Sequence, residues 1–410
     1  MGIIVQKFGG TSVGSIERIQ NVANRVISEK EQGKEVVVVV SAMGKTTDQL
    51  VSLAHEISKK PSKREMDMLL TTGEQVTISL LSIALQEKGY ETISYTGWQA
   101  GILTEPVHQN ARILDIKTDR IKEQLNLGKI VIVAGFQGVT EDGEITTLGR
   151  GGSDTTAVAL AAALKAEKCD IYTDVTGVYT TDPRYVKSAR KLDGISYDEM
   201  LELANLGAGV LHPRAVEFAK NYQVSLEVRS SMELERGTIV EEEPNMEQNL
   251  VVRGIAFEDQ VTRISVCGLP NNIHTLSTIF STLANHGINV DIIIQSTSND
   301  EQTSISFSIK TNDLEETLDV LNQYKEKLHF ENIESETKLA KVSIVGSGMI
   351  SNPGVAAQMF KVLADKRIQI KMVSTSEIKV SAVVEEEKMI EAVEILHEAF
   401  ELSKEEAVTK

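Results

Sequence analysis

The stretch Ile3-Ile4-Val5-Gln6-Lys7-Phe8-Gly9-Gly10-Thr11-Ser12 indicates a buried strand that runs directly into a glycine turn. Its first residues are β-branched, which favours a strand. Two glycines let the backbone approach an anion closely, and a helix that starts after them adds positive potential. Lys7, where the strand ends, supplies a positive charge for a phosphoryl oxygen. We interpret the stretch as an anion-binding turn; the alternative is an ordinary strand-to-helix turn with a surface lysine.

From this strand onward, residues 1–240 alternate short apolar runs with amphipathic segments. The apolar runs predict strands at 3–5, 35–40, 92–95, 130–134, 169–173 and 226–228. The amphipathic segments predict helices at 21–29, 67–87, 154–165 and 214–220. Such alternation predicts an α/β fold in which a mostly parallel sheet is sandwiched by helices. Open sheets of this kind bind ligands at the carboxyl ends of their strands.

Residues 250–410 contain an internal repeat. The segment 279–284 is echoed by 359–364, and the apolar pattern of 288–293 returns at 368–373. We interpret the repeat as two small α+β modules, the first at 264–337 and the second formed by 250–263 together with 341–410. The acidic, proline-containing stretch 241–249 predicts the linker. The alternative is a chance similarity between amphipathic helices.

Composition and charge exclude several classes of protein. The 410 residues include 42 Lys and Arg against 59 Asp and Glu, a net charge of −17. Such a field repels phosphate backbones, so we expect no nucleic-acid partner. The longest apolar runs, 36–40 and 157–164, are shorter than the ~20 residues of a membrane helix, and no signal peptide is recognisable. Two scattered cysteines favour the cytoplasm, and seven histidines without ligand spacing predict no protein metal site.

A second glycine-rich segment is Thr147-Leu148-Gly149-Arg150-Gly151-Gly152-Ser153-Asp154-Thr155-Thr156. Three glycines around an arginine make a nest of backbone amides beside a guanidinium, which suits a carboxylate bound through two hydrogen bonds. Ser153 or Asp154 can cap the helix that follows. The alternative, a turn with an incidental arginine, explains the three glycines poorly.

The segment that follows the predicted strand 169–173 is a third candidate. It places an aspartate (Asp174), an aromatic residue (Tyr179) and an arginine (Arg184) after one strand end. Together these residues can hold the ribose, base and phosphate of a nucleotide. The alternative is local, because aspartate and proline also simply make turns.

Three separated motifs resemble those of the aspartokinases in the amino-acid kinase superfamily: Lys7-Phe8-Gly9-Gly10-Thr11-Ser12, Thr72-Gly73-Glu74 and Gly149-Arg150-Gly151-Gly152-Ser153-Asp154. The repeat resembles the paired ACT modules, of ferredoxin-like fold, that give such enzymes feedback control. The resemblance covers essentially the whole chain and is greatest to the lysine-sensitive, Bacillus-like type. It implies a kinase domain at 1–240 and two ACT modules with the boundaries given above.

The resemblance implies a role for each motif. ATP, accompanied by Mg²⁺, would be bound by Lys7, Phe8, Gly9, Gly10, Thr173, Asp174, Tyr179 and Arg184. Aspartate would be bound by Ser41, Thr47, Glu74, Arg150 and Ser153, with Arg150 on its carboxylate and Glu74 on its amino group. Lys7 would stabilise the transferring phosphoryl group, and Asp154 would be structural or would organise the metal. One departure is Gly209, near which relatives often carry a lysine.

The implied reaction transfers the γ-phosphoryl group of ATP to the side-chain carboxylate of L-aspartate. The product, 4-phospho-L-aspartate, leads to lysine through diaminopimelate, to threonine and to methionine. A carboxylate with a pKa of about 3.9 is already ionised at neutral pH, so the lack of a convincing general base fits this chemistry. Two alternatives stay open: a kinase for glutamate or acetylglutamate, and a catalytically silent amino-acid sensor.

The resemblance also implies an allosteric amino acid bound where the two modules pair, often across a subunit interface. Lysine is the expected effector and threonine the alternative. The implied contacts are Asn289, Val290, Asp291 and Gln295 from the first module and Gly348, Met349, Gln369, Ile370 and Ser374 from the second. The implied assembly is a homo-oligomer or a heterotetramer of long and short subunits, the short one starting at Met246.

Overall fold

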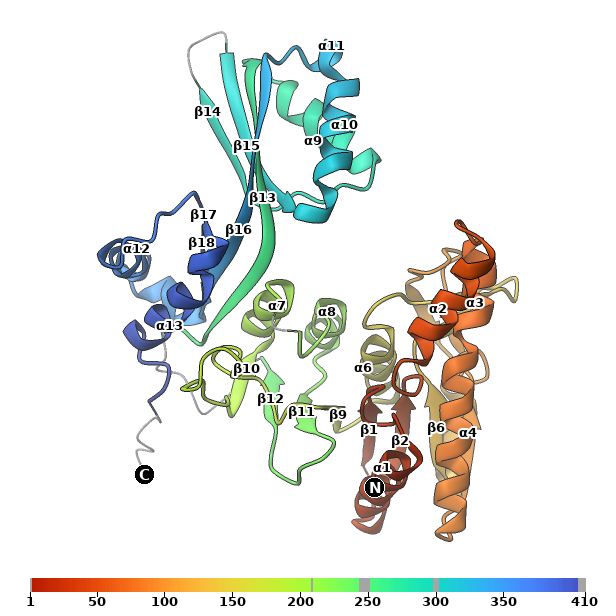
Figure 1. The fold of residues 1–410 in the computed structure, drawn as a ribbon. Helices are drawn as coiled ribbons and strands as arrows, with labels where there is room; N and C mark the ends of the chain where they lie inside the picture. The colour runs from red at the N-terminus through yellow and green to blue at the C-terminus, as the bar shows by residue number, and fades with distance from the viewer. Residues whose placement is uncertain (1, 208, 243–250, 298–301, 405–410) are drawn as a thin grey trace. The chain divides into compact units, whose positions relative to one another are not determined.

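The computed structural model describes residues 2–207, 209–242, 251–297 and 302–404 (Figure 1). The chain forms two compact units. The first comprises Met1–Tyr179, Lys191–Asn205 and Gly209–Gln248, and the second comprises Thr180–Arg190, Leu206–Ala208 and Asn249–Lys410. Most of the predicted linker, including Met246, lies outside the described residues.

A sheet of eight strands forms the centre of the first unit. In sheet order the strands are β10 (Gly194–Ser196), β12 (Thr238–Glu241), β11 (Leu226–Ser230), β9 (Lys168–Thr173), β1 (Ile3–Phe8), β2 (Glu35–Val40), β6 (Ile130–Ala134) and β3 (Thr92–Tyr95). Neighbouring strands are parallel except for β11 and β12. The predicted mostly parallel α/β sheet is therefore confirmed, and β2, β3 and β6 have the predicted bounds.

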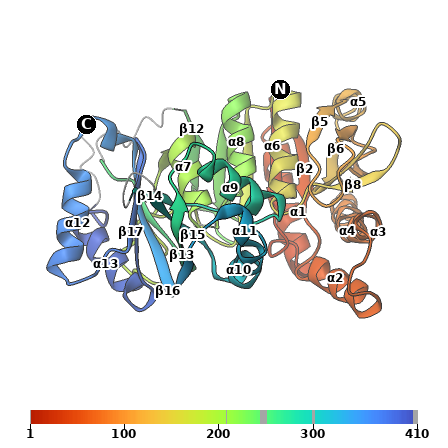
Figure 2. The ribbon, with the colours of Figure 1, turned by 90° about the horizontal axis from the view of Figure 1, so that it is seen from above.

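Helices cover both faces of this sheet (Figure 2). On one face, α1 (Ile16–Glu31) and α4 (Thr72–Glu87) share an apolar cluster with the strands, in which Val22, Val38 and Leu81 are buried. α6 (Gly152–Leu164) packs against β1, β2 and β9, and α8 (Pro213–Tyr222) packs beside α6. α6 is buried along almost its whole length, so it is a core element of the unit.

The structure differs from the prediction in the segment 67–87. This segment spans two helices, α3 (Lys63–Leu70) and α4, where the sequence indicated one. The hydroxyl groups of Thr71 and Thr72 donate back to the carbonyls of Met68 and Leu69. Such side-chain bonds compete with the regular backbone ladder and loosen a helix locally.

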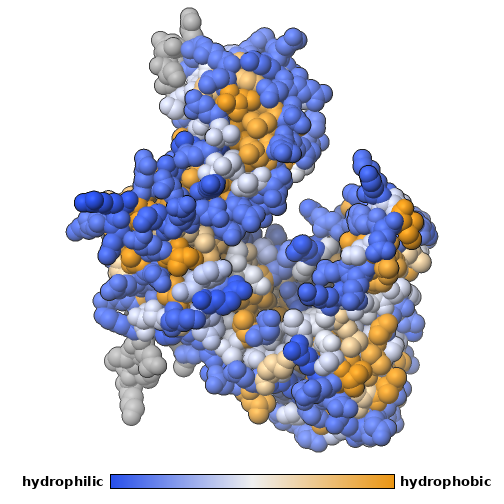
Figure 3. All heavy atoms as spheres, viewed as in Figure 1, coloured by the Kyte–Doolittle hydropathy of each residue, from blue (hydrophilic) through white to orange (hydrophobic). Residues whose placement is uncertain are grey.

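The same helical stretch, 63–87, is long and apolar enough to cross a membrane by length and composition alone. Half of its most apolar window is buried inside the protein, where Leu81 and Leu85 belong to the core. Its outer side leaves an apolar patch over α4, where Val76 and Ile83 are exposed (Figure 3). The stretch is therefore packed in the first unit as a pair of covering helices.

Several short elements of the first unit are missing from the sequence-based prediction. They are the helices α2 (Thr46–Ile57), α5 (Asp119–Asn126) and α7 (Tyr197–Asn205), the strands β10 and β12 of the large sheet, and a second sheet with the order β5 (Ile113–Ile116), β4 (Ile102–Thr104), β7 (Gln137–Val139) and β8 (Ile145–Thr147). Strands this short give too little alternation to be recognised. β8 matters for function because it leads directly to residues 148–151 and α6.

The second unit is built around one sheet of six strands. In sheet order they are β14 (Ile293–Thr297), β15 (Gln302–Lys310), β13 (Gly254–Pro270), β16 (Asn332–Val345), β18 (Lys379–Glu385) and β17 (Met372–Thr375). The long strands β13 and β16 pair antiparallel, from Gly254 with Val345 to Cys267 with Asn332. They therefore join both halves of the repeat in one continuous sheet.

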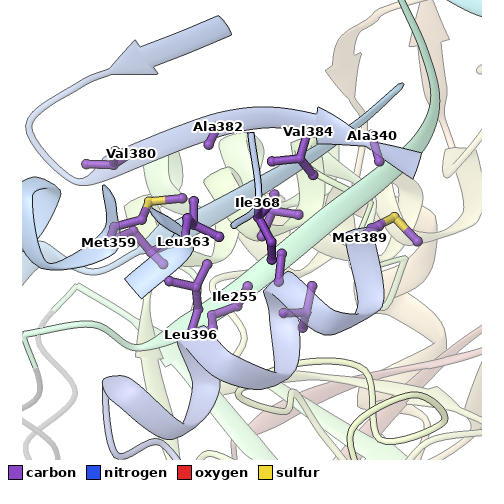
Figure 4. Packing of buried hydrophobic residues seen from close by; sticks show 14 of the residues in the cluster. Ile255, Ala340, Met359, Leu363, Ile368, Val380, Ala382, Val384, Met389 and Leu396 are labelled. Atoms are coloured by element: carbon purple, nitrogen blue, oxygen red, sulfur yellow. The ribbon is translucent and has the colours of Figure 1, made fainter. Parts of the chain in front are cut away.

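Each half of this sheet carries its own helices. α9 (Thr275–Asn285) and α10 (Leu314–Gln323) belong to one half, and α12 (Val355–Asp365) and α13 (Met389–Ala399) belong to the other, whose core is shown in Figure 4. Ile279 and Leu283 are fully buried in α9, as Met359 and Leu363 are in α12. The echoed sequences thus occupy equivalent core positions.

A short segment from the middle of the sequence, Thr180–Arg190, belongs to the second unit. The N–H of Ile255 donates to the carbonyl of Thr180 at 2.7 Å, and the Thr180 hydroxyl bonds to Nε2 of His397 at 2.9 Å. Val186 is 3% exposed and lies in the same apolar cluster as Ile255. The segment therefore completes the core of the second unit.

Candidate active site

The glycine turn after β1 is packed against the loop that follows β2. A Cβ added to Gly10 would lie 2.9 Å from the carbonyl oxygen of Ala42 and 3.2 Å from that of Gly44. The N–H of Gly44 donates to the carbonyl of Gly10 at 2.9 Å. The sequence needs glycine at position 10 because no side chain fits between these two backbone segments.

Phe8 does not offer its side chain to a ligand. Its ring stacks on that of Tyr172, with 4.5 Å between the centroids, and is fully buried in the cluster shared with α1. Gly9 is held beside it by a hydrogen bond from its N–H to the carbonyl of Tyr172, at 3.3 Å. The predicted nucleotide contact of Phe8 therefore reduces to its backbone, because the last side chain of β1 faces the core.

Lys7 and Asp154 form an ion pair. Lys7 Nζ lies 2.5 Å from Asp154 Oδ1, and the two side chains are only 11% and 13% exposed. The pair joins the end of β1 to the first turn of α6, where a carboxylate is also stabilised by the helix dipole. A Cβ added to Gly9 would lie 3.4 Å from Lys7 Nζ, so the ammonium group sits next to the glycine turn.

Glu74 is a buried carboxylate in the first turn of α4. Its Oε1 accepts a hydrogen bond from the N–H of Ala42 at 3.1 Å, whereas its Oε2 has no hydrogen-bond partner among the described residues. Burial raises the pKa of Glu74 from 4.5 to about 8, against the opposing effect of the backbone hydrogen bonds. A cationic ligand that reached Oε2 would favour the charged form.

Ser41 and Thr47 flank the loop that contacts both Gly10 and Glu74. Ser41 follows β2 directly, and its N–H donates to the carbonyl of Phe8 at 3.1 Å. Thr47 lies in the first turn of α2. Both residues are partly exposed. Their hydroxyl groups are therefore placed on a loop that joins the glycine turn to the buried carboxylate.

The loop between β8 and α6 carries Arg150. Gly149 and Gly151, on either side of it, have φ angles of 78° and 67°, which glycine adopts without strain. Arg150 is exposed and forms no hydrogen bond or ion pair with residues in the described part of the chain. Ser153 is buried against Gly135, whose added Cβ would lie 2.7 Å from Ser153 Oγ. The guanidinium group of Arg150 is thus available for a ligand.

The segment after β9 contains the predicted nucleotide residues. β9 is adjacent to β1, with Tyr172 in register with Phe8, so the two strand ends lie side by side. The Thr173 hydroxyl donates to the Asp174 carboxylate at 3.1 Å, and the Tyr179 hydroxyl bonds to that of Thr176 at 2.7 Å. Asp174 is exposed. These side chains follow the strand next to the glycine turn.

Arg184 is the predicted nucleotide residue that the structure assigns to the second unit. Its Nε donates to Asp182 Oδ1 at 3.0 Å, and this hydrogen-bonded guanidinium lowers the pKa of Asp182. The contacts that connect Lys7, Asp154 and Glu74 to the glycine turn do not include Arg184. Its contact with the nucleotide stays a prediction.

The nine predicted effector residues all belong to the second unit. Two of them, Gln369 and Ile370, lie in the loop before β17 and line a cavity of about 410 Å³. Its other lining residues are Arg263, Ser265, Glu334, Ser335, Glu336 and Lys371. Glu336 pairs with Arg263 at 2.7 Å and with Lys371 at 2.9 Å. The cavity therefore contains charged groups of both signs.

The other predicted effector positions do not line this cavity. Asn289, Val290 and Asp291 precede β14, Gln295 is on β14, Gly348 and Met349 lie in the 3₁₀ turn Ser347–Ser351, and Ser374 is on β17. The Asp291 carboxylate pairs with Lys341, which also pairs with Glu258 at 3.0 Å. Val290, Met349 and Ile370 pack partly against apolar clusters, so ligand contacts there would use backbone groups.

Asp67, on α3, is a buried residue that the sequence analysis missed. It accepts hydrogen bonds from the hydroxyl of Thr147 at 2.6 Å and from the N–H of Gln109 at 3.1 Å, and it bonds to Nδ1 of His108 at 2.7 Å. It thereby fastens α3 to the end of β8. The sequence signal is an acid inside the apolar run Met66-Asp67-Met68-Leu69-Leu70.

Replacing Asp67 with alanine should lower the free energy of unfolding by about 3 kcal/mol, because the buried hydroxyl of Thr147 loses its acceptor, as do the half-buried partners His108 and Gln109. Urea unfolding of the full chain measures the change. The control Glu56→Ala removes an exposed carboxylate of α2 and should change the free energy by less than about 0.5 kcal/mol. Equal stability of the two variants would contradict the anchoring role of Asp67.

Comparison with known proteins identifies the family. The sequence profile of the amino acid kinase family matches residues 2–230, and that of the ACT domain matches residues 264–324 and 342–400. The chain is 77% identical to an aspartokinase of Bacillus sp. (strain MGA3), with 98% of both chains covered. It is 76% identical to aspartokinase 2 of Bacillus subtilis (strain 168), with 98% of this chain and 99% of the relative covered.

A solved structure extends this similarity to the fold. The crystal structure of E. coli aspartokinase III in complex with aspartate and ADP (R-state) is 28% identical and has a TM-score of 0.81, with 97% of this chain and 99% of that chain covered. The chain therefore belongs to the amino acid kinase family and, within it, to the aspartokinases with paired ACT domains. It is an ATP-dependent phosphotransferase.

Proposed function

We propose that this chain transfers the γ-phosphoryl group of ATP to the side-chain carboxylate of L-aspartate. The product would be 4-phospho-L-aspartate, the precursor of lysine (through diaminopimelate), threonine and methionine. One observation carries the proposal: contacts run from Asp154 to Lys7, from Gly10 to Ala42, and from Ala42 to Glu74. They connect the glycine turn to a buried carboxylate, one oxygen of which has no hydrogen-bond partner among the described residues. E. coli aspartokinase III, crystallised with aspartate and ADP, is similar over nearly the whole chain.

In this proposal the ATP phosphates lie on the glycine turn, where the Lys7 ammonium and the amides of Gly9 and Gly10 offset their charge. Mg²⁺ enters with ATP, since nucleotide phosphates supply most of its ligands. Asp154 pairs with Lys7, so its carboxylate lies at the same edge of the sheet as the glycine turn. The nucleoside is held by the residues that follow β9, namely Thr173, Asp174 and Tyr179.

Aspartate binds, in this proposal, with its α-carboxylate on Arg150 and its ammonium group on Glu74 Oε2. Ser41, Thr47 and Ser153 add hydrogen bonds. The pair Glu74 and Arg150 favours a substrate with a free amino group, which acetylglutamate lacks. The reacting carboxylate is ionised at neutral pH, so catalysis consists of positioning two anions and neutralising their charge.

The test is hydroxamate formation from aspartate, ATP, Mg²⁺ and hydroxylamine, with the acyl phosphate trapped as it forms. We expect product with aspartate, and at least about a hundredfold less with glutamate or acetylglutamate. Product from glutamate or acetylglutamate alone would reassign the substrate. No product from any of the three, with lysine binding retained, would leave an amino-acid sensor without kinase activity.

We also propose that lysine inhibits the enzyme by binding to the second unit, with threonine as the alternative effector. The cavity beside Gln369 offers Arg263 and Lys371 to a carboxylate, and Glu334 and Glu336 to ammonium groups. A similar structure, E. coli aspartokinase III with lysine and aspartate (T-state), has a TM-score of 0.75 to this chain. Lysine must bind one conformation more tightly than another to inhibit. We propose an oligomer, of identical chains or of long and short subunits, as the inhibited assembly.

Replacing Lys371 with methionine should raise the lysine concentration for half-inhibition about tenfold, because one charged ligand group is lost from the cavity. Turnover without lysine should stay within about twofold, since Lys371 belongs to the second unit. Inhibition curves at fixed aspartate measure both quantities. The control Lys361→Met removes an exposed lysine of α12. An unchanged inhibition curve for Lys371→Met would place the effector elsewhere.

A further inference from the structure

The beginning of α8 holds one side of the loop that carries Arg150. Arg214, in the first turn of α8, directs its guanidinium at two backbone carbonyls: Nη1 donates to Leu148 at 2.8 Å and Nη2 donates to Ala111 at 2.6 Å. Leu148 and Ala111 are both fully buried, and a buried carbonyl without a donor is costly. Leu148 is the second residue before Arg150, so the hydrogen bond from Arg214 fixes the start of the loop.

His212 supports the other side of the same loop. A Cβ added to Gly151 would lie 2.1 Å from Cγ of His212, so the imidazole ring packs directly against the Gly151 backbone. Its Nδ1 accepts a hydrogen bond from the N–H of Arg214 at 3.3 Å, which leaves the proton of the neutral ring on Nε2. Burial lowers the pKa of His212, and Arg214 and Arg150 lower it further against the effect of Asp154. A neutral ring adds no repulsion beside Arg150.

Arg150 lies between these two supports. Its neighbours Gly149 and Gly151 have much conformational freedom in an unsupported loop, and the arginine side chain adds its own rotamer entropy. The helix that follows the loop, α6, packs against α8 and carries Asp154, which pairs with Lys7. The contacts of α8 thus hold the loop at both ends, while its exposed guanidinium is left for a ligand.

We propose that Arg214 and His212 are positioning residues for the acceptor substrate: they fix the backbone of residues 148–151 so that Arg150 meets the aspartate carboxylate without a further ordering step. The inference rests on the proposed role of Arg150. Preorganisation of a binding group strengthens the binding of the ligand that this group contacts. Loss of the support should therefore weaken the binding of aspartate more than that of ATP.

The test is steady-state kinetics of full-length variants, with aspartate and MgATP varied separately. Arg214→Met keeps an unbranched apolar side chain and loses both donors, so we expect the KM for aspartate to rise at least about tenfold and the KM for ATP to change less than about twofold. Arg214→Lys keeps a cationic donor and should recover part of the loss. Lys220→Met removes a cation from the last turn of α8, where it pairs with Asp198, and should behave as the wild type.

The double variant of Arg214→Met and Arg150→Gln shows whether Arg214 acts through Arg150. Its KM for aspartate should be no higher than that of Arg150→Gln alone, because the supported side chain is already gone. If the increases in the KM for aspartate of the two single variants multiply in the double variant, the inference is overturned. It is also overturned if Arg150→Gln raises the KM for aspartate and Arg214→Met leaves it unchanged. An unchanged KM in Arg150→Gln would overturn the proposed role of Arg150, and the inference with it.

A second variant keeps the inference testable if Arg214→Met does not fold, as judged by thermal unfolding. His212→Ala removes the ring beside Gly151 and leaves both carbonyl bonds of Arg214 in place. The KM for aspartate should rise about threefold, with the KM for ATP unchanged. An equal change in both constants, or in neither, would contradict a positioning role.

Discussion

Replacing Lys7 with methionine should lower kcat by about a thousandfold, the loss expected when one preorganised charge at a transferring phosphoryl group is removed. The Lys7 side chain is only 11% exposed, so water cannot readily replace its charge in stabilising the phosphoryl group. The same change leaves the nearly buried Asp154 carboxylate without its cationic partner. Hydroxamate formation at saturating ATP and aspartate measures the loss.

Two control variants separate the charge of Lys7 from its surroundings. Asp154→Asn keeps the ammonium group and removes its partner, so a smaller loss of about tenfold is expected. Lys34→Met removes another lysine of the first unit, paired with Glu167, and should leave kcat unchanged. Lysine should still bind to Lys7→Met, because the predicted effector residues belong to the second unit. Joint loss of turnover and lysine binding would contradict this division between the units.

The KM for aspartate should fall as pH rises from about 6.5 to 8, by up to about tenfold per pH unit. The pKa of Glu74 in the empty site is about 8, so its carboxyl group is mostly protonated at pH 7 and must lose the proton to pair with an ammonium group. Glu74→Gln should raise the KM about a hundredfold and make it independent of pH in this range. A KM series for both proteins checks this, and calorimetry in two buffers should show proton release when aspartate binds to the wild type only.

Glu74 also determines a pH dependence of stability. Its pKa in the folded protein lies above the ordinary 4.5, so the folded state holds this proton more tightly than the unfolded chain does. The corresponding stabilisation is fully present below pH 4.5 and is lost as pH rises through about 8. Without ligand, Glu74→Gln should therefore unfold at a higher temperature than the wild type at about pH 8.5. A lower unfolding temperature would contradict the raised pKa that burial gives this carboxyl group.

The strands at the centre of the first unit were predictable because their signal is local. β2 is an uninterrupted run of valines, 36–40, and a parallel strand buried on both faces needs no alternation. The end of β1 was not predictable in this way. The apolar run stops at Val5, yet pairing with β2 and β9 continues through Lys7 and Phe8, because both neighbouring strands extend that far.

The candidate site was predictable where a close neighbour requires glycine: Gly10 lies against the backbone of the loop after β2, and Gly151 lies against the ring of His212. Asp67 and Arg214 were missed because their partners lie far along the chain: Thr147 is 80 residues from Asp67, and Ala111 is 103 residues from Arg214. No local pattern identifies such partners. The place of Thr180–Arg190 was missed for the same reason, since its polar, proline-containing sequence is typical of a turn, while the core that Val186 and Ala189 meet lies far along the chain.

The Thr180–Arg190 segment bears on any shortened form of the protein. A polypeptide that starts at Met246 contains the six-stranded sheet but lacks Val186, whose burial contributes about 1.5–3 kcal/mol. It also lacks Thr180, which accepts from the N–H of Ile255 and bonds to His397. Such a fragment must repack its core or take up an equivalent peptide from another chain. A separately made regulatory subunit would then be a receptor for a segment of the kinase, and the two would assemble by fragment complementation.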